Sequence, residues 1–204
     1  MIIEKHIKKV EIPEDHFQIV KGYAKKIEFG GISSVYTDHE ERMRYLEENQ
    51  LTGQLGEYGG CVALYDFEKY IEKQEQEVKK GDGDEGTDIV GAKIPIDIKT
   101  SNVKVGTENW GKVLGARHLM VTPREYSPNM IYVACVVLDT PRHTDKIGNV
   151  YVIGWCWGRN LREEQWTERP NDRYPNGRNK SGFRLKYGKL KPLHTLNWKD
   201  MLEH

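Results

Sequence analysis

The sequence predicts a single domain of the α+β or α/β class, with a mixed central β-sheet flanked by helices. Its 204 residues are enough to bury a substantial core in one domain. Hydrophobic residues recur with helical spacing up to residue 80 and alternate as in strands after residue 86. Since no repeat or linker divides the chain, we expect these helices and strands to pack together.

The N-terminal segment is expected to begin with an edge strand, because residues 1–12 alternate loosely between apolar and polar side chains. Pro13 and the two acids after it are typical of a helix start, since proline suits the first turn and acids favour the positive end of the helix dipole. We expect this helix to reach about Glu28, before a glycine pair.

Two further helical segments are expected before residue 81. Thr37 and Glu40 form a capping-box pattern, which predicts a helix that continues through Leu46. Helical spacing resumes at Leu51 and continues into the charged stretch 68–80.

The chain beyond the glycine-rich turn 81–86 reads as strands. Isoleucines alternate with other side chains over 94–99, which indicates a strand. The other strands are expected at Arg117–Val121, Ile131–Leu138, Val150–Trp157 and Phe183–Tyr187. The polar stretch 158–182, rich in Arg, Asn and Gly, is expected to be a long surface connection.

Composition places the chain among folded soluble proteins, because 37% of its residues are hydrophobic and 30% are charged. No apolar run approaches the roughly 20 residues of a membrane span, and the N-terminus lacks the layout of a secretory signal. The cysteines, Cys61, Cys135 and Cys156, show no zinc-site spacing, which indicates reduced thiols and a cytoplasmic protein. Since no phosphate-binding Gly-Lys-Ser/Thr loop is present, we expect no dependence on ATP.

The net charge of zero hides an asymmetry between the two halves of the chain. Residues 1–98 hold 13 Lys/Arg and 21 Asp/Glu, a net of −8, whereas residues 99–199 hold 18 and 8, a net of +10. The basic half could form a surface that binds polyanions. Alternatively, its charges simply belong to solvated strand edges and loops.

Basic residues late in the chain are the candidates for contacts with nucleic-acid phosphates. They are Arg159, Arg162, Arg173, Arg178 and Lys180. Trp155, Trp157 and Trp166 lie among them and could stack on unpaired bases, although Trp155 and Trp157, on one face of a strand, are more typical of a core.

The chemistry-bearing segment is 86–100. Asp97 and Lys99 are two residues apart on the predicted strand and therefore point to the same face. Asp88 begins what looks like the preceding strand of a hairpin, with Gly91 near its turn, which brings a second carboxylate close to the first. Two neighbouring carboxylates repel unless a cation lies between them, and oxygen ligands suit Mg²⁺, with Mn²⁺ as a substitute. Lysine beside such a metal could position or deprotonate a water, or stabilise charge developing on a phosphate.

Asp88, followed nine residues later by Asp97-Ile98-Lys99, resembles the motif of the PD-(D/E)XK nuclease superfamily. Thr87 stands where the family has proline, a variation that leaves the metal ligand intact. The resemblance implies a restriction-endonuclease-like fold and Mg²⁺-dependent hydrolysis of DNA. It also implies Glu57 as a third metal ligand or water-mediated partner, and the backbone carbonyl of Ile98 as a further ligand.

The helix around Glu57 offers a physical reason for including it. Glycines within a helix cost about 1 kcal/mol each relative to alanine, so some packing advantage is expected. Gly53, Glu57 and Gly60 share a face by their spacing, and we expect that face to lie against the sheet and bring the carboxylate to the metal. Alternatively, Gly59 and Gly60 break the helix and Glu57 lies on the surface.

The resulting prediction is one nuclease domain over 1–204, with an N-terminal helical extension (1–50), a catalytic core (51–140), and C-terminal strands with a basic loop (141–204). Two other functions remain open: a non-catalytic DNA-binding or assembly protein on the same fold, and an RNA-directed nuclease. Cleavage of both strands of a duplex by one site per chain would favour a homodimer. No membrane partner is expected.

Overall fold

The structure is a computed structural model, and it describes six stretches of the chain. These are residues 2–26, 39–80, 87–103, 109–138, 149–166 and 180–197. Within them, only the backbone is described for 39–46, 77–80, 164–166 and 180–181. The fold is mixed α and β, as the sequence predicts.

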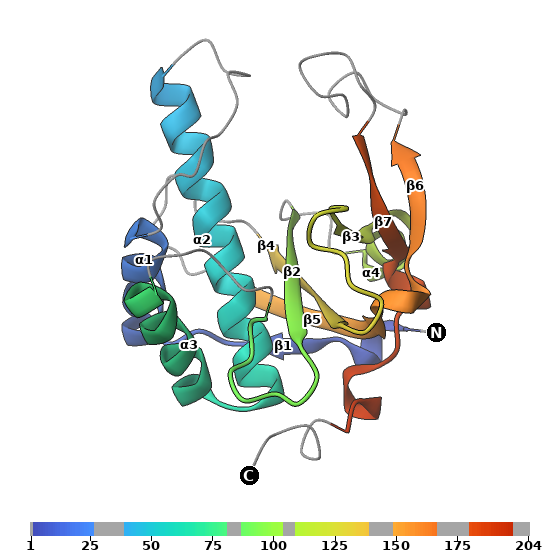
Figure 1. Cartoon of the computed structure of the whole chain (residues 1–204), viewed down its shortest axis with the longest axis horizontal. Helices are drawn as coiled ribbons and strands as arrows, with labels where there is room; N and C mark the ends of the chain where they lie inside the picture. Colours follow the sequence, from blue (N-terminus) through green and yellow to red (C-terminus); the bar gives the residue numbers. More distant parts are fainter. Residues whose placement is uncertain are drawn as a thin grey trace.

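Three helices form a layer on one side of the molecule: α1 (Glu14–Lys26), α2 (His39–Leu64) and α3 (Phe67–Lys80) (Figure 1). The helix predicted after Pro13 is therefore confirmed. The next two predicted helical segments meet without a break in α2, where the Thr52 hydroxyl donates to the Glu48 carbonyl one turn earlier. The second segment, expected to continue from Leu51 into 68–80, is instead divided between α2 and α3, because the chain leaves the helix at 65–66 and the Asp66 side chain accepts from the Lys69 amide at the start of α3. The expected division at residue 50 falls inside α2.

The central sheet has four strands in the order β1-β5-β4-β2. Their bounds are β1 Lys8–Val10, β2 Ile96–Val103, β4 Ile131–Leu138 and β5 Asn149–Trp157. β2 pairs parallel with β4, and the other two pairings are antiparallel, which makes the sheet mixed. The predicted N-terminal edge strand is β1, and the predicted strands at β4 and β5 are confirmed.

A second, antiparallel sheet covers the opposite face of the central sheet, in the order β3-β7-β6 (Figure 1). Its strands are β3 His118–Val121, β6 Arg162–Trp166 and β7 Lys180–Lys186, and the short helix α4 (Trp110–Ala116) lies with it. The 3₁₀ turns are η1 Glu4–His6, η2 Gly158–Asn160, η4 Tyr187–Lys189 and η5 Leu193–Thr195. The expectation of a surface connection over 158–182 is wrong at both ends, because β6 and the start of β7 pair with each other there.

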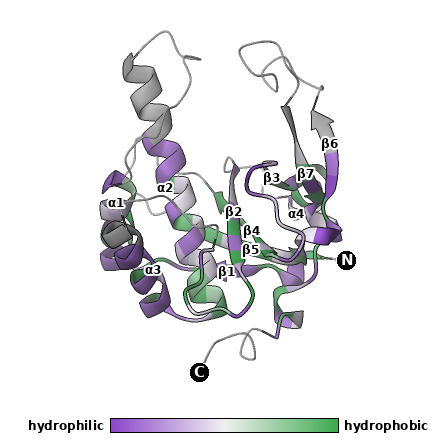
Figure 2. Cartoon of the chain, in the orientation of Figure 1, coloured by the Kyte–Doolittle hydropathy of each residue, from purple (hydrophilic) through white to green (hydrophobic). Residues whose placement is uncertain are grey.

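Two hydrophobic cores lie on the two faces of the central sheet. Along β4, Val133 and Cys135 face the helices, while Tyr132 and Ala134 face the second sheet. Every residue of β4 is buried, because both faces of the sheet are covered, and the central strands are the most hydrophobic part of the view (Figure 2).

Glycines let α2 pack closely on the sheet. A Cβ on Gly56 would lie 2.6 Å from Cβ of Thr100, and one on Gly60 would lie 2.5 Å from Cδ1 of Ile98. Gly53 has open space around it. We expected Gly53 and Gly60 to lie on the face of α2 that packs on the sheet. This expectation is wrong in part, because Gly56 and Gly60 touch the sheet and Gly53 does not.

Gly56→Ala is expected to destabilise the protein by about 1–3 kcal/mol, because the added methyl group forces Thr100 and the helix apart. Gly53→Ala is the matched control on the same helix, and it should stabilise by up to about 1 kcal/mol through helix propensity. Urea unfolding measures both free energies. Equal effects of the two substitutions would contradict the close packing of Gly56.

All three cysteines are buried free thiols, as the sequence suggests. Within the described stretches, no helix combines the length and the apolar character that a membrane span requires.

Candidate active site

Asp88 lies along the free edge of β2. Where β2 pairs with β4, the Ile131 amide donates to the Pro95 carbonyl. The odd-numbered residues of β2 therefore direct their backbone N–H and C=O groups toward β4, and the even-numbered residues direct theirs toward the free edge. At that edge the Asp88 amide donates to the Ile96 carbonyl at 2.7 Å, and the Ile98 amide donates to Oδ2 of Asp88 at 2.5 Å. The first bond holds the backbone of Asp88 against the strand, and the second holds its carboxylate there.

The expected hairpin strand at Asp88 is wrong, because residues 88–91 form bends and a turn. Gly91 has φ of +74°, a conformation that favours glycine. The hydroxyl of Thr87 accepts from the Ile96 amide at 3.3 Å, so a side chain replaces one backbone partner of a regular hairpin. The turn nevertheless brings Asp88 beside β2, as the hairpin was expected to do.

Asp97 and Lys99 lie on the face of β2 that points away from α2. Ile98 and Thr100 pack on the glycines of α2, and the Ser101 hydroxyl lies 2.8 Å from the Tyr187 hydroxyl on the opposite side. The ammonium of Lys99 is 3.0 Å from Oδ2 of Asp97. Strand alternation therefore places this pair as the sequence predicts.

A second carboxylate, Glu125, also pairs with Lys99 and was not foreseen. The ammonium of Lys99 donates to Oε1 of Glu125 at 3.0 Å, and the Thr122 hydroxyl donates to Oε2 at 2.6 Å. The pattern Thr122-x-x-Glu125 resembles a capping box, which is the signal that could have indicated an ordered glutamate here.

The charges of this group depend on burial. Burial, and secondarily the nearby Asp88 carboxylate, raises the pKa of Asp97 to about 8, although Lys99 acts in the opposite direction. Burial disfavours the Lys99 ammonium, but Asp97 and Glu125 outweigh it and raise the pKa of Lys99. Burial alone would raise the pKa of Glu125, yet hydrogen bonds from Thr122 and Lys99 lower it.

Glu57 belongs to a second charged group, on the helical side of β2. The ammonium of Lys73, from α3, lies 2.8 Å from Oε2 of Glu57 and 2.5 Å from Oδ1 of Asp88. Gln54 and Gln74 also donate to Oε2 of Glu57. The Glu57 side chain is 18% exposed and faces α3, so it is neither the sheet-facing ligand nor the surface residue expected from the sequence.

Lys73 was missed because it looks like one more charge on a charged helix. It is only 3% exposed, and it lies on the buried face of α3 with Tyr70 and Gln74. The polar pair Lys73-Gln74, placed three and four residues after an apolar Tyr70, was the available signal.

The donors around Asp88 and Asp97 fit Mg²⁺ in part. Two carboxylates suffice for a Mg²⁺ that keeps several waters, and the Ile98 carbonyl points to the same edge as Asp88. Both oxygens of Asp88 already accept hydrogen bonds, and Glu57 is held by Lys73. Among the described residues, no three His, Cys, Asp or Glu side chains gather closely enough to hold a metal. Asp88, Asp97 and the Ile98 carbonyl would therefore be the protein ligands.

The basic residues expected to contact phosphates are only partly described. The guanidinium of Arg159 lies 4.7 Å from the ring centroid of Trp157, and Arg162 begins β6. Arg173 and Arg178 lie outside the described residues, and Lys180 is described by its backbone alone. Trp155 is buried in the core, and only the backbone of Trp166 is described.

A pH dependence of stability follows from the raised pKa of Asp97. Between about pH 4 and pH 8 the unfolded chain loses the Asp97 proton while the folded chain retains it, so stability should fall as pH rises. Without divalent metal, the wild type should lose a few kcal/mol over this range relative to Asp97→Asn, as measured by urea unfolding at several pH values. Parallel profiles for the two proteins would contradict the buried, proton-retaining carboxyl group.

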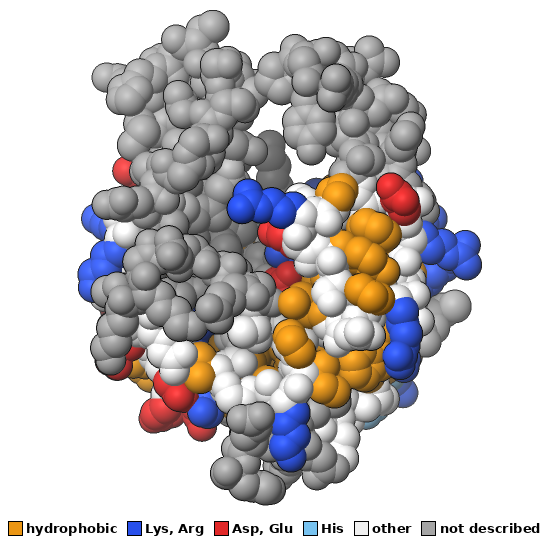
Figure 3. Space-filling view, in the orientation of Figure 1, with side chains coloured by type: hydrophobic (Ala, Val, Ile, Leu, Met, Phe, Trp, Pro, Cys, Tyr) orange, Lys and Arg blue, Asp and Glu red, His pale blue; other side chains and the backbone are white. Residues whose placement is uncertain are grey.

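Comparison of the chain with protein-family models, curated proteins and solved structures found no match. The proposal of a function therefore rests on the arrangement of Asp88, Asp97, Lys99 and their neighbours. In the space-filling view, acidic atoms reach the surface near the centre of one face, beside a basic side chain (Figure 3).

Proposed function

We propose that the protein is a Mg²⁺-dependent nuclease that hydrolyses DNA phosphodiester bonds, on a fold of the restriction-endonuclease type. The observation that carries the proposal is two buried carboxylates at the edge of the central sheet: Asp88 along the free edge of β2, and Asp97 beside the Lys99 ammonium. The resemblance of these residues to the PD-(D/E)XK motif supports it.

The burial of Asp97 supports a cation site. Asp97 is 3% exposed, and among the described residues its ionic partner is Lys99, which is shared with Glu125. The Asp88 carboxylate disfavours the charged form of Asp97, and a divalent cation held by both carboxylates would remove that cost. Bound Mg²⁺ would polarise the phosphate and lower the pKa of a water.

The position of Lys99 favours one of its two expected roles. Asp97 and Glu125 hold its proton, so Lys99 is a poor acceptor for a proton from water. Its ammonium can instead stabilise negative charge that develops on the phosphate. Glu125 would position Lys99 for this role.

Glu57 and Lys73 would act through Asp88. The Lys73 ammonium holds one carboxylate oxygen of Asp88, and the Ile98 amide holds the other. This arrangement fixes the carboxylate at the β2 edge, which is how a rigid scaffold keeps a ligand in place. Lys73 and Glu57 are therefore positioning residues in this proposal.

The Lys73 ammonium also favours a second candidate function, that of a non-catalytic nucleic-acid-binding protein. The Lys73 ammonium already pairs with both Asp88 and Glu57, and a protein that only binds nucleic acid needs no metal at this place. The two candidates differ in whether Mg²⁺ changes the nucleic acid.

A cleavage assay separates these candidates. The purified chain is incubated with linear duplex DNA, circular DNA, single-stranded DNA or RNA, each in Mg²⁺ and in EDTA. The nuclease proposal expects Mg²⁺-dependent cleavage of at least one DNA substrate and none in EDTA. Cleavage of circular DNA identifies an endonuclease, and cleavage of RNA alone identifies the RNA-directed alternative. Binding without cleavage in both conditions contradicts the nuclease and supports the binding protein.

A further inference from the structure

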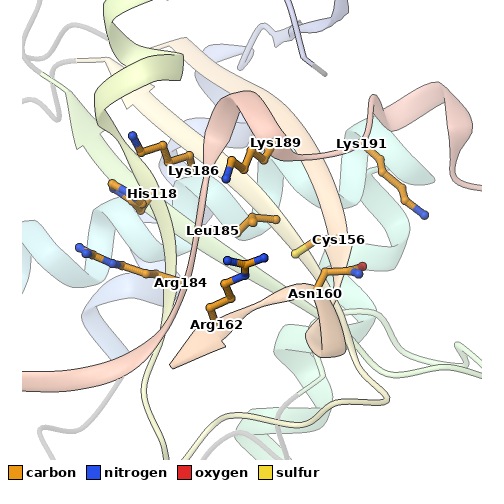
Figure 4. A pocket seen from close by; sticks show the side chains of 9 residues that line it. All are labelled: His118, Cys156, Asn160, Arg162, Arg184, Leu185, Lys186, Lys189 and Lys191. Atoms are coloured by element: carbon orange, nitrogen blue, oxygen red, sulfur yellow. The ribbon is translucent and has the colours of Figure 1, made fainter. Parts of the chain in front are cut away.

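A basic pocket of about 420 Å³ lies where the second sheet meets β5 and the C-terminal segment (Figure 4). Its size is in the range of pockets for small ligands. Five of the residues that line it are cationic: Arg162, Arg184, Lys186, Lys189 and Lys191. Of these, Arg162 and Lys189 point toward the centre of the pocket, whereas the charged ends of the other three point outward (Figure 4). No Asp or Glu is among the residues that line it.

The arrangement of the cations is suited to an anion. The side chains of Arg162 and Lys189 lie on either side of Leu185 (Figure 4). The Lys191 ammonium is directed elsewhere, 4.7 Å from the ring centroid of Trp155. Within the described part of the chain, Arg162 and Lys189 form no ion pair with a carboxylate. Their charges are therefore available to a ligand, and the Asn160 amide adds a further donor to the lining.

The other lining groups do not oppose negative charge. Burial raises the pKa of Cys156 to about 12, so its thiol stays neutral. His118 and Leu185 complete the lining, and neither can carry a negative charge under ordinary conditions.

The pocket is separate from the candidate active site but lies on the same face of the central sheet. Asp97 pairs with Tyr132, and Tyr132 pairs with Cys156, so these residues form one row across three strands. Neighbouring strands are about 4.8 Å apart, so the backbone of Cys156 lies about 10 Å from that of Asp97.

We propose that this pocket binds phosphate groups with at least two clustered negative charges, supplied either by a nucleic-acid strand or by a free polyphosphate. The inference goes beyond the proposed nuclease activity and does not require it. Guanidinium and ammonium groups that converge on a concave site bind phosphate oxygens through charge-assisted hydrogen bonds. Arg162 and Lys189 supply two positive charges to the pocket, which favours a ligand with at least two negative charges over a single phosphodiester.

The test compares Arg162→Gln/Lys189→Gln with a control that loses the same charge elsewhere, Arg117→Gln/Lys112→Gln. Arg117 and Lys112 are exposed and do not line the pocket. Binding of tripolyphosphate and of a short duplex oligonucleotide is measured for all three proteins by calorimetry and fluorescence anisotropy. Metal-free buffer with EDTA prevents cleavage, so the result is independent of the nuclease proposal.

The proposal expects at least one probe to bind the pocket variant about tenfold or more weakly, while the control resembles the wild type. Weaker tripolyphosphate binding assigns the pocket to a free polyphosphate. Weaker oligonucleotide binding with a shallower salt dependence, and no tripolyphosphate binding, assigns it to a nucleic-acid strand. If neither probe binds, or if the pocket variant and the control bind equally, the proposal is overturned.

Discussion

Replacing Asp97 by asparagine is expected to lower the rate of Mg²⁺-dependent DNA cleavage by about a thousandfold or more. Asparagine keeps the size of the side chain but removes a charged ligand, and each 1.36 kcal/mol of lost transition-state stabilisation lowers the rate about tenfold. DNA binding should persist, because phosphate contacts come from basic residues that the change does not touch. Initial cleavage rates and anisotropy titrations measure the two effects.

Asp66→Asn is the matched control for this experiment. Asp66 is exposed and accepts a hydrogen bond from the Lys69 amide at the start of α3, a role that asparagine also fills. Its cleavage rate should equal that of the wild type. If Asp97→Asn cleaves as fast as Asp66→Asn in Mg²⁺, Asp97 is not a catalytic ligand.

Replacing Lys73 by methionine is expected to destabilise the fold by about 3–5 kcal/mol. The ammonium of Lys73 lies between Glu57 and Asp88 and is almost fully buried, so its removal leaves two carboxylates without their counter-ion. Methionine fills a similar volume, which separates the loss of charge from the loss of packing. The midpoint of urea unfolding gives the change in stability.

Lys69→Met tests the same substitution one turn earlier on the helix. Lys69 pairs with Glu72 at 2.7 Å in a more exposed place, so we expect a loss below about 1 kcal/mol. Adding Glu57→Gln to Lys73→Met should recover part of the stability, because it removes one of the two unpaired charges. Equal unfolding midpoints for Lys73→Met and Lys69→Met would show that the buried ammonium does not hold the two carboxylates.

The strands with strong hydrophobic periodicity could be predicted from the sequence, and for a physical reason. β4 is apolar throughout because helices cover one of its faces and the second sheet covers the other. The alternation in β2 likewise predicted that Asp97 and Lys99 share a face, since alternation depends only on the backbone.

The elements that long-range contacts stabilise could not be predicted. β6 reads Arg-Glu-Glu-Gln-Trp, which has no apolar alternation, and its pairing with β7 makes it a strand. α4 has only seven residues, and the cap at Asn109, whose side chain accepts from the Lys112 amide, was its main local signal. Lys73 approaches Asp88 only after α3 packs against α2, so its role depends on tertiary structure.

The claim that Asp88 and Asp97 form the divalent-cation site is tested most directly by calorimetric titration of Mg²⁺ or Mn²⁺ into the wild type, Asp97→Asn and Glu57→Gln. We expect a single site in the wild type, its loss in Asp97→Asn, and its retention in Glu57→Gln, because Glu57 is bound by Lys73 rather than aimed at Asp97. Binding that survives in Asp97→Asn, or no binding to the wild type, would contradict the assignment of these carboxylates as metal ligands.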